Sequence, residues 1–101
     1  MLTKKQIITI QKAFNGAGQR AIFKILGDTN RYRIFEMLGE KKKITVSDIA
    51  KILKVSVPLT SQHLKILEQA KILRKEKLGR TVYYTIQTKN KIAMSIFKTV
   101  L

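Results

Sequence analysis

A run of polar side chains recurs at helical spacing within residues 57–70. Gln62 can form a bidentate pair with adenine N6 and N7, and Lys65 can reach guanine O6 and N7 or a phosphate. Ser61 can contact a base or a backbone oxygen. On a helix drawn at about 100° per residue, Pro58 and Gln69 fall on the same side. The spacing predicts that Pro58, Ser61, Gln62, Lys65 and Gln69 form a face that contacts a DNA major groove, with an ordinary solvated helix face as the alternative.

The opposite side of this helix is expected to pack against the helix before it. It carries Leu59, His63, Leu64, Ile66, Leu67 and Ala70. His63 is the only histidine, and its place among apolar residues favours a structural role over a ligand or base contact. The chain has no Cys, so it cannot assemble a three- or four-ligand transition-metal site or a Cys–His catalytic triad on its own. We therefore expect no metal, no cofactor and no enzymatic activity.

A short basic ribbon follows the helix. It carries four cations and one acid: Arg74, Lys75, Lys77, Arg80 and Glu76. Such a ribbon is expected to reach DNA phosphates or a minor groove beside the helix. The alternative is that its lysines only deter pairing of an exposed strand with other chains.

The ribbon has the alternation typical of strands. Val82, Tyr84 and Ile86 alternate with polar neighbours over residues 81–86, after a first run at residues 72–78. Gly79-Arg80 between the two runs indicates a β-hairpin. Residues 72–86 are therefore predicted to form a two-stranded wing.

Two helices must position the polar face. Thr45-Val46-Ser47-Asp48 matches a capping box, with Asp48 in the acidic place, and opens a short amphipathic helix. Lys54-Val55-Ser56 reads as a turn, Ser56 as the cap of the next helix, and Pro58 suits the first turn of that helix. Residues 45–70 therefore predict a helix-turn-helix.

Further helices are expected on both sides of this unit. One covers residues 4–14 before a breaker at Asn15-Gly16, and a second ends at Gly27. A third is capped by Asp28 or Thr29 and stops at Gly39, and Thr88 can cap a last one. The fold class is mainly α with a small β-hairpin: a winged helix-turn-helix of about five helices and a two-stranded wing.

The two terminal segments, 1–18 and 88–101, are expected to hold a homodimer together. Both carry an apolar stripe at helical spacing: Ile7, Ile10 and Phe14 in the first, and Ile92, Ile96 and Val100 in the second. The alternative is that these stripes cover the core of their own chain.

Length and charge bound the remaining possibilities. The 101 residues are expected to form one domain, 1–101, and 45% apolar residues indicate a folded chain. Lys and Arg number 21 against 6 Asp and Glu, a formal charge of +15, which favours a polyanionic partner. Nucleic acid is the first candidate and an anionic membrane surface the second. No apolar run approaches the roughly 20 residues of a membrane span, so a cytoplasmic location is expected.

Three motifs in order resemble the ArsR family of winged-helix repressors, over about residues 19–87. They are LGDTNRYRIFEML before the helix-turn-helix, ITVSDIAKILKVSVPLTSQHLKILEQAKIL within it, and LGRTVYYTI in the wing. The resemblance implies a dimer held by its first and last helices that reads a palindromic operator in double-stranded DNA. It also implies release of DNA when a metal or another signal binds.

The chain departs from the family at both familiar metal sites. Thr45-Val46-Ser47-Asp48 stands where metal sensors often carry Cys-x-Cys, and residues 88–101 hold no Asp, Glu or His. Lys54 and Lys71 replace turn glycines that are common in the family.

We therefore expect a sequence-specific DNA-binding regulator, a repressor without the usual metal sites. The alternatives are a constitutive or non-specific DNA-binding protein, or a winged-helix module that binds protein or RNA. A protein of the membrane surface that uses its basic terminal helices is a further alternative.

Overall fold

The described part of the chain forms six helices and three strands. The computed structural model describes residues 1–14, 17–40 and 43–100; the breaker expected at Asn15-Gly16 and the side chains of Phe14 and Val100 lie outside the described residues. In chain order the elements are α1 (Lys4–Phe14), α2 (Ala17–Leu26), α3 (Thr29–Glu40), β1 (Ile44–Thr45), α4 (Val46–Leu53), α5 (Val57–Gln69), β2 (Leu73–Leu78), β3 (Thr81–Ile86) and α6 (Lys91–Val100).

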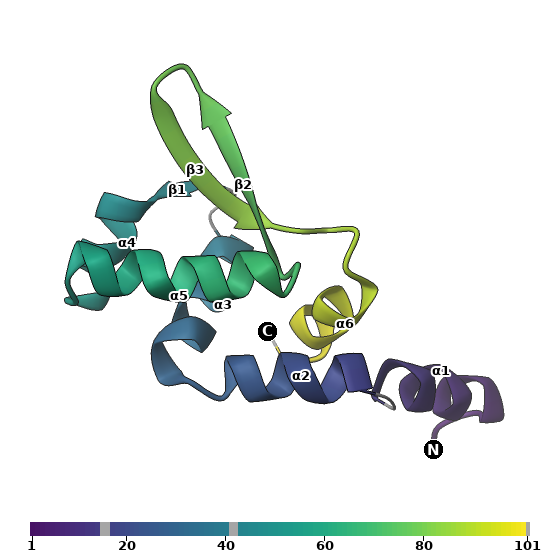
Figure 1. Ribbon diagram of the computed structural model, residues 1–101. Coiled ribbons are helices and arrows are strands. Elements are labelled where there is room, and N and C mark those ends of the chain that lie inside the picture. The colour runs from purple at the N-terminus through teal and green to yellow at the C-terminus, as the bar shows by residue number, and fades with distance from the viewer. Residues whose placement is uncertain (15–16, 41–42, 101) are drawn as a thin grey trace.

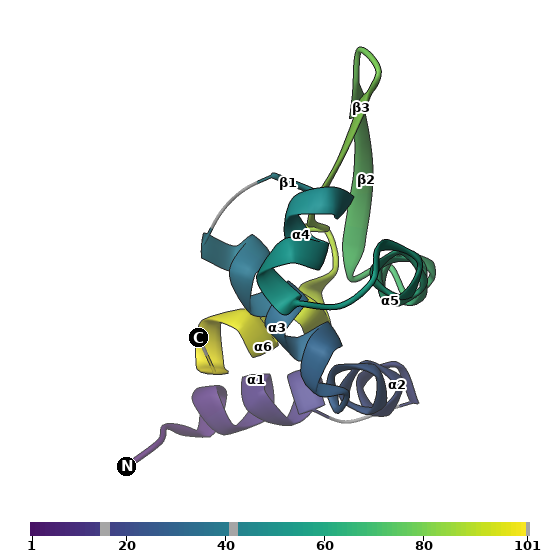
Figure 2. The same ribbon diagram turned by 90° about the vertical axis from the view of Figure 1, so that its left-hand side faces the viewer.

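This is the winged helix-turn-helix that the sequence predicted. Helix α3 crosses the middle of the molecule, with α4 and α5 on one side and α2 and α6 on the other (Figures 1 and 2). The hairpin of β2 and β3 projects from the body as a wing, while α1 lies at the opposite end (Figure 1). No helix of the described residues is long and apolar enough to cross a membrane.

The sheet has one strand more than expected. The strand order is β1-β3-β2, and all pairs are antiparallel. The two-residue strand β1 pairs Ile44 with Tyr84 and Thr45 with Tyr83, so it ties the start of the helix-turn-helix to the base of the wing. A segment this short has no recognisable alternation, and only its partner strand makes it a strand.

The core lies where α3 meets the helix-turn-helix and the base of the wing. Fully buried side chains come from every one of these elements: Ile34, Phe35, Ile49, Leu64, Leu67 and Ile72. On the other side of α3, Phe35 meets Phe97 of α6 edge to face, with ring centroids 6.0 Å apart. These contacts fix the position of α5 relative to the rest of the chain.

Two predicted helix boundaries are wrong. The last helix begins at Lys91 rather than after Thr88, because Asn90 Oδ1 accepts the N–H of Ala93 and caps it. Gly39 does not stop α3, which runs to Glu40. A Cβ on Gly39 would overlap the ring of Phe97, so the glycine permits the close approach of α3 and α6 instead.

Candidate nucleic-acid interface

Both helices of the helix-turn-helix are capped at their starts, as the sequence predicted. Thr45 Oγ1 accepts the N–H of Asp48 at 3.3 Å at the start of α4, and Ser56 Oγ accepts that of Leu59 at 3.2 Å at the start of α5. Pro58 lies in the first turn of α5, where its missing N–H leaves no broken helical bond. Since neighbouring side chains supply these caps, the starts of both helices depend on local sequence.

The turns that follow both helices use lysine in a left-handed conformation. Lys54 has φ 59° and Lys71 has φ 60°. These are the two lysines that the sequence analysis noted in place of turn glycines, and each accepts the strain of a Cβ at positive φ. The Lys54 N–H bonds to the Lys51 carbonyl, and the Lys71 N–H to that of Glu68.

The polar face of α5 is exposed along its whole length. Each of its five predicted members is exposed: Pro58, Ser61, Gln62, Lys65 and Gln69. None of the side chains of Ser61, Gln62, Lys65 and Gln69 makes a hydrogen bond or ion pair within the described residues. Their donors and acceptors are therefore available to a partner.

The buried face of α5 differs in part from the prediction. Its centre is formed by Thr60, His63, Leu64 and Leu67, whereas Leu59 is 39% exposed. Thr60 is fully buried, and its hydroxyl donates to the carbonyl of Ser56 at 2.8 Å, so its polar group is satisfied within the helix. Such a threonine is hard to recognise from residue type alone. Val57, 49% exposed in the first turn beside the polar face, also escaped the prediction.

His63 lies inward, as expected. His63 as a whole is 8% exposed, and its Nδ1 is buried without a hydrogen-bond partner in the described structure. Asp28, which caps α3 by accepting the N–H of Arg31 at 3.1 Å, lies near enough for His63 to influence it. The Arg31 N–H, more than the charges of Arg31 and His63, lowers the pKa of the Asp28 carboxyl below its usual value. His63 therefore belongs to the packing seam between α5 and the start of α3.

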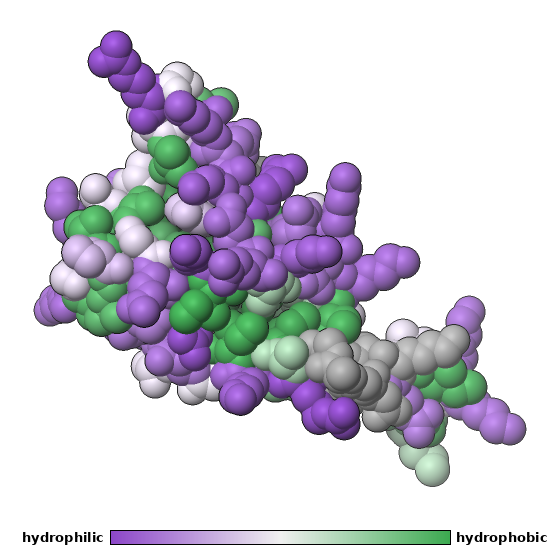
Figure 3. Space-filling view, viewed as in Figure 1, coloured by the Kyte–Doolittle hydropathy of each residue, from purple (hydrophilic) through white to green (hydrophobic). Residues whose placement is uncertain are grey.

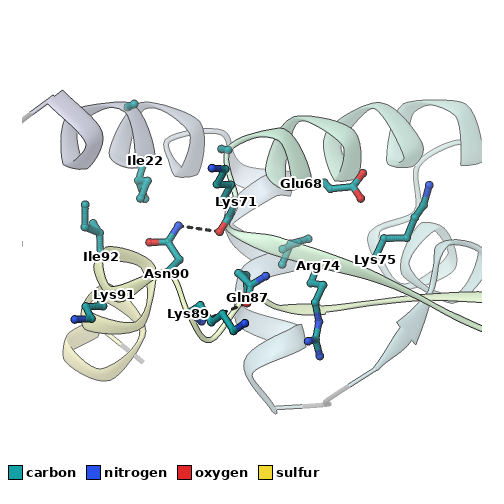
Figure 4. A pocket seen from close by; sticks show the side chains of 13 residues that line it. Ile22, Glu68, Lys71, Arg74, Lys75, Gln87, Lys89, Asn90, Lys91 and Ile92 are labelled. Carbon is teal, nitrogen blue, oxygen red and sulfur yellow. Dashed lines mark hydrogen bonds between the residues drawn. The ribbon is translucent and has the colours of Figure 1, made fainter.

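The pleat of the wing divides its cations between two faces. Residues opposite one another in an antiparallel pair share a face, and Lys75 and Lys77 lie opposite Tyr84 and Val82. Arg74 lies on the other face with Glu76. Figure 4 shows the same division, with Lys75 reaching toward α5 and Arg74 pointing away from it.

Ion pairs form on the face of the wing that carries Arg74. Glu76 Oε1 lies 3.0 Å from Lys43 Nζ, and its Oε2 lies 3.9 Å from Arg74. Lys77 and Arg80 are exposed and have no ion pair within the described residues. Lys75 approaches the hydroxyl of Tyr84, whose pKa is raised by burial despite this lysine. The face turned to α5 thus keeps its positive charge for a partner.

The tip of the wing combines a cation with an apolar side chain. Gly79 has φ +64°, the left-handed conformation that the hairpin turn requires, and Arg80 follows it. Leu78 beside them is 51% exposed, a feature that the alternation of the strand did not single out. Figure 3 shows mainly hydrophilic residues along the wing, and hydrophilic and hydrophobic areas side by side on the face below it where α5 lies.

Within residues 1–14, 17–40 and 43–100, no group of three or more His, Cys, Asp or Glu side chains could hold a metal ion. The titratable groups of the interface are mainly lysine and arginine, whose chemistry is the neutralisation and hydrogen bonding of anions. The arrangement is an exposed polar helix beside a basic, protruding ribbon. Such a surface can place a helix in the major groove and a ribbon on the adjacent backbone.

Comparison with known sequences identifies one family. Residues 28–75 match the sequence model described as "Bacterial regulatory protein, arsR family". The cadmium resistance transcriptional regulatory protein CadC of Listeria innocua is 38% identical over 74 residues, which are 73% of this chain and 62% of that protein. The chain thus spans less than two thirds of that relative. The transcriptional repressor SdpR of Bacillus subtilis is 34% identical over 67 residues, covering 66% of this chain and 73% of the repressor.

Solved structures share the fold. The transcriptional repressor PagR of Bacillus anthracis superimposes with a TM-score of 0.68 at 27% identity, over 81% of this chain and 92% of that one. The homodimeric winged helix-turn-helix DNA-binding domain of a possible ArsR-family regulator from Mycobacterium bovis gives a TM-score of 0.69 at 20% identity. That match covers 99% of this chain and 83% of the other.

Proposed function

Because the chain belongs to the arsR family of bacterial regulatory proteins, we propose that it is a dimeric repressor of transcription that binds double-stranded DNA sequence-specifically. The observation that carries this proposal is the exposed polar face of α5 beside the positively charged face of the wing. A regulator of this kind acts on the chromosome, so the proposal places the protein in the cytoplasm. It includes no enzymatic role.

In this proposal α5 reads the bases of the major groove. Ser61 and Gln62 lie in its first half, the part of a recognition helix that meets base edges, and Lys65 follows one turn after Ser61. Gln62 pairs with adenine and Lys65 with guanine, while Ser61 contacts a base or the backbone. Pro58 and Gln69 stand at the two ends of the face. Val57, which is 49% exposed beside this face, would contact a thymine methyl group.

The wing holds the complex in place. Lys75, Lys77 and Arg80 neutralise phosphates beside the groove that α5 enters. Arg74 has a smaller part, because it lies on the other face of the wing and shares Glu76 with Lys43. Phosphate contacts carry no sequence information, so the wing adds affinity, and α5 decides which sequence is bound.

Two copies are proposed to pair with each other through α1 and to bind a palindromic operator together. Ile7 and Ile10 are 43% and 44% exposed on α1, beside which Ile8 is 47% exposed. Helix α6 contributes less than the sequence suggested, because its Ile96 is 2% exposed and lies in the core of its own chain. To read a palindromic operator, such a dimer must present its recognition helices to successive turns of DNA, about 34 Å apart.

The dimer is tested by the mass in solution. Ile7→Glu combined with Ile10→Glu places charges on the proposed interface, and the expected result is a monomer of 11.6 kDa where the parent chain has twice that mass. Light scattering behind a sizing column measures it. Thr9→Glu, on the other side of α1, is the matched control and should remain a dimer. A parent chain that is monomeric at tens of micromolar contradicts the proposal.

The signal that releases DNA is not expected to be a metal ion. The chain has no Cys, and its single His63 is buried. One equivalent of Zn²⁺ should therefore leave DNA binding unchanged in a gel-shift titration. Loss of the complex would indicate a metal site shared between two copies.

The function is tested by selecting bound sequences from a random DNA pool. A repressor of this kind should enrich one palindromic sequence, with half-sites about one helical turn apart. A pool that is retained without enrichment would indicate non-specific DNA binding. A pool that is not retained at all would favour a module that binds protein or RNA.

A further inference from the structure

A cavity of about 880 Å³ opens between α2, the end of α5, the base of β2 and the start of α6 (Figure 4). None of the five residues of the polar face of α5 lines it, and of the proposed phosphate contacts Lys75, Lys77 and Arg80 of the wing only Lys75 does. Its volume falls in the range of sites that enclose small organic molecules, about 300–1,000 Å³.

The walls of this cavity are apolar. Ile22 of α2 and Ile92 of α6 point toward each other across the space (Figure 4). Leu73, which is buried, and Ala21 and Ala70 complete the apolar lining. An occupant with a hydrocarbon or aromatic body would bury its surface here.

The rim of the cavity is cationic. It carries Lys71, Lys89 and Lys91, all exposed. The one carboxylate of the lining belongs to Glu68, which points with Lys75 away from Ile22 and Ile92 (Figure 4). The positive charge of the three lysines is therefore not cancelled at the opening.

The first turn of α6 adds hydrogen-bond donors at the same place. Asn90 Oδ1 accepts the N–H of Ala93, which leaves the N–H groups of Lys91 and Ile92 without an acceptor inside the helix. No acidic residue stands in this turn, so the positive end of the helix dipole is not neutralised by α6 itself. Gln87 Nε2 makes no hydrogen bond within the described residues and lies on the same rim.

The high charge of the chain does not by itself explain this rim. A second cavity, of about 330 Å³ between α3, β3 and α6, has only Lys43 among its cations, and Lys43 is paired with Glu76. The four lysines and one arginine that line the first cavity are therefore a local feature of it.

We propose that this cavity binds an amphipathic organic anion. A carboxylate or sulfonate head would lie at the start of α6 between Lys71, Lys89 and Lys91, and the apolar body would lie between Ile22 and Ile92. The lining favours this occupant over a DNA phosphate, because a phosphate has no apolar body with which to fill the space.

Two residues that line the cavity are hydrogen-bonded to the turn between α5 and the wing. Asn90 Nδ2 donates to the carbonyl of Lys71 at 2.8 Å, and the N–H of Gln87 donates to the carbonyl of Ile72 at 2.9 Å. A ligand that displaces α6 or its preceding loop would therefore displace the end of α5. We expect such a ligand to change DNA affinity, and this part of the inference rests on the proposed function.

Calorimetric titration of the full chain with decanoate tests the binding site without DNA. The expected result is saturable binding of one decanoate per chain. The neutral 1-decanol and the short acetate should each bind about tenfold more weakly or worse, because each lacks one half of the recognised chemistry. Absence of saturable decanoate binding at millimolar concentration overturns the proposal.

Two pairs of substitutions distinguish decanoate binding at this site from the general attraction of an anion to a basic protein. Lys89→Gln with Lys91→Gln should weaken decanoate binding about tenfold. The matched control is Lys4→Gln with Lys5→Gln, which removes two charges from the first turn of α1 and should have little effect. Equal losses in both pairs would overturn the proposal, since binding would then follow net charge.

A filling variant distinguishes a ligand site from a contact between two copies. Ala21→Trp, at an exposed position on the cavity lining, should abolish decanoate binding and leave the mass in solution unchanged. If it changes the oligomeric state instead, a second copy covers the cavity and the proposal is wrong.

The effect of the ligand on DNA affinity is measured separately, by adding decanoate to the protein bound to its selected operator. A shift in DNA affinity that Ala21→Trp removes supports the coupling. Decanoate binding without any such shift would refute the coupling alone, and failure to select an operator would refute the proposed function alone.

Discussion

Replacing Gln62 by Ala should separate base reading from affinity. The side chain of Gln62 is exposed on α5 and makes no hydrogen bond within the described residues, so its removal breaks no hydrogen bond there. The start of α5 is held by Ser56 six positions earlier, and Ala favours the helix more than Gln does. Any change in DNA binding therefore reports on the complex rather than on folding.

The size of the effect follows from the contact that is lost. A bidentate pair between Gln62 and adenine distinguishes its base by about 1–3 kcal/mol, a factor of about 5 to 150 in affinity for each protomer. The loss should appear on the selected operator and be nearly absent on a shuffled sequence. Arg80 offers the opposite pattern, because a phosphate contact is present on both sequences.

Arg80→Ala should weaken both DNAs alike and flatten their salt dependence. Each phosphate neutralised adds a slope of about −0.9 to the plot of log affinity against log salt, so a dimer that loses two contacts should lose about 2 units of slope. Gln62→Ala should leave the slope unchanged. Lys98→Ala, in the last turn of α6 and far from the wing, is the matched control for the loss of one charge.

Fluorescence anisotropy of labelled operator and shuffled DNA, titrated at several salt concentrations, measures both quantities. If Gln62→Ala weakens both DNAs equally, Gln62 contacts the backbone and the assignment of the reading face is wrong. If neither substitution changes binding, the DNA surface lies elsewhere on the molecule.

Three further predictions concern stability. Leu67→Ala, at a fully buried position, should lower the free energy of unfolding by about 2–5 kcal/mol in urea titrations. Leu59→Ala, on the same helix but 39% exposed, should cost clearly less; similar losses would show that the buried face of α5 is wrongly placed. Lys54→Gly should stabilise the chain by up to about 1 kcal/mol, because glycine adopts the observed φ of 59° without strain. A loss of stability would show that the turn is not left-handed in solution. The pKa of Asp28 is lowered in the folded chain, so its contribution to stability is present above the usual carboxyl pKa and is lost as the pH falls through the folded value. The stability difference between the parent chain and Asp28→Asn should therefore shrink in acid, and a difference independent of pH would contradict this origin.

Features set by neighbouring residues could be read from the sequence. The caps at Thr45 and Ser56 bond to N–H groups three residues away, and the polar positions of α5 recur with the helical period. Strand β3 alternates over residues 81–86, and Gly79 provides the turn that joins it to β2. The elements of the candidate interface and the exposure of its nine side chains followed from these local patterns.

Features that depend on distant residues could not be read in this way. Thr60 is buried because the core surrounds it, and Ile96 lies in the core because α6 folds back against α3. Gly39 faces a phenylalanine 58 positions later, and no local pattern reveals that approach. The alternation of the wing divides its cations between two faces, but only the tertiary structure shows which of these faces is turned toward α5.

The cavity beside α6 is the clearest case. Its walls come from four elements that are widely separated in the chain, and its four lysines are unremarkable among the 21 cations of the sequence. Local hydrogen bonds and the alternation of side chains determine which helices and strands form, because they act within a few residues. Burial decides where those elements meet, since it sums contacts over the whole chain, and only that sum places four lysines around one apolar space.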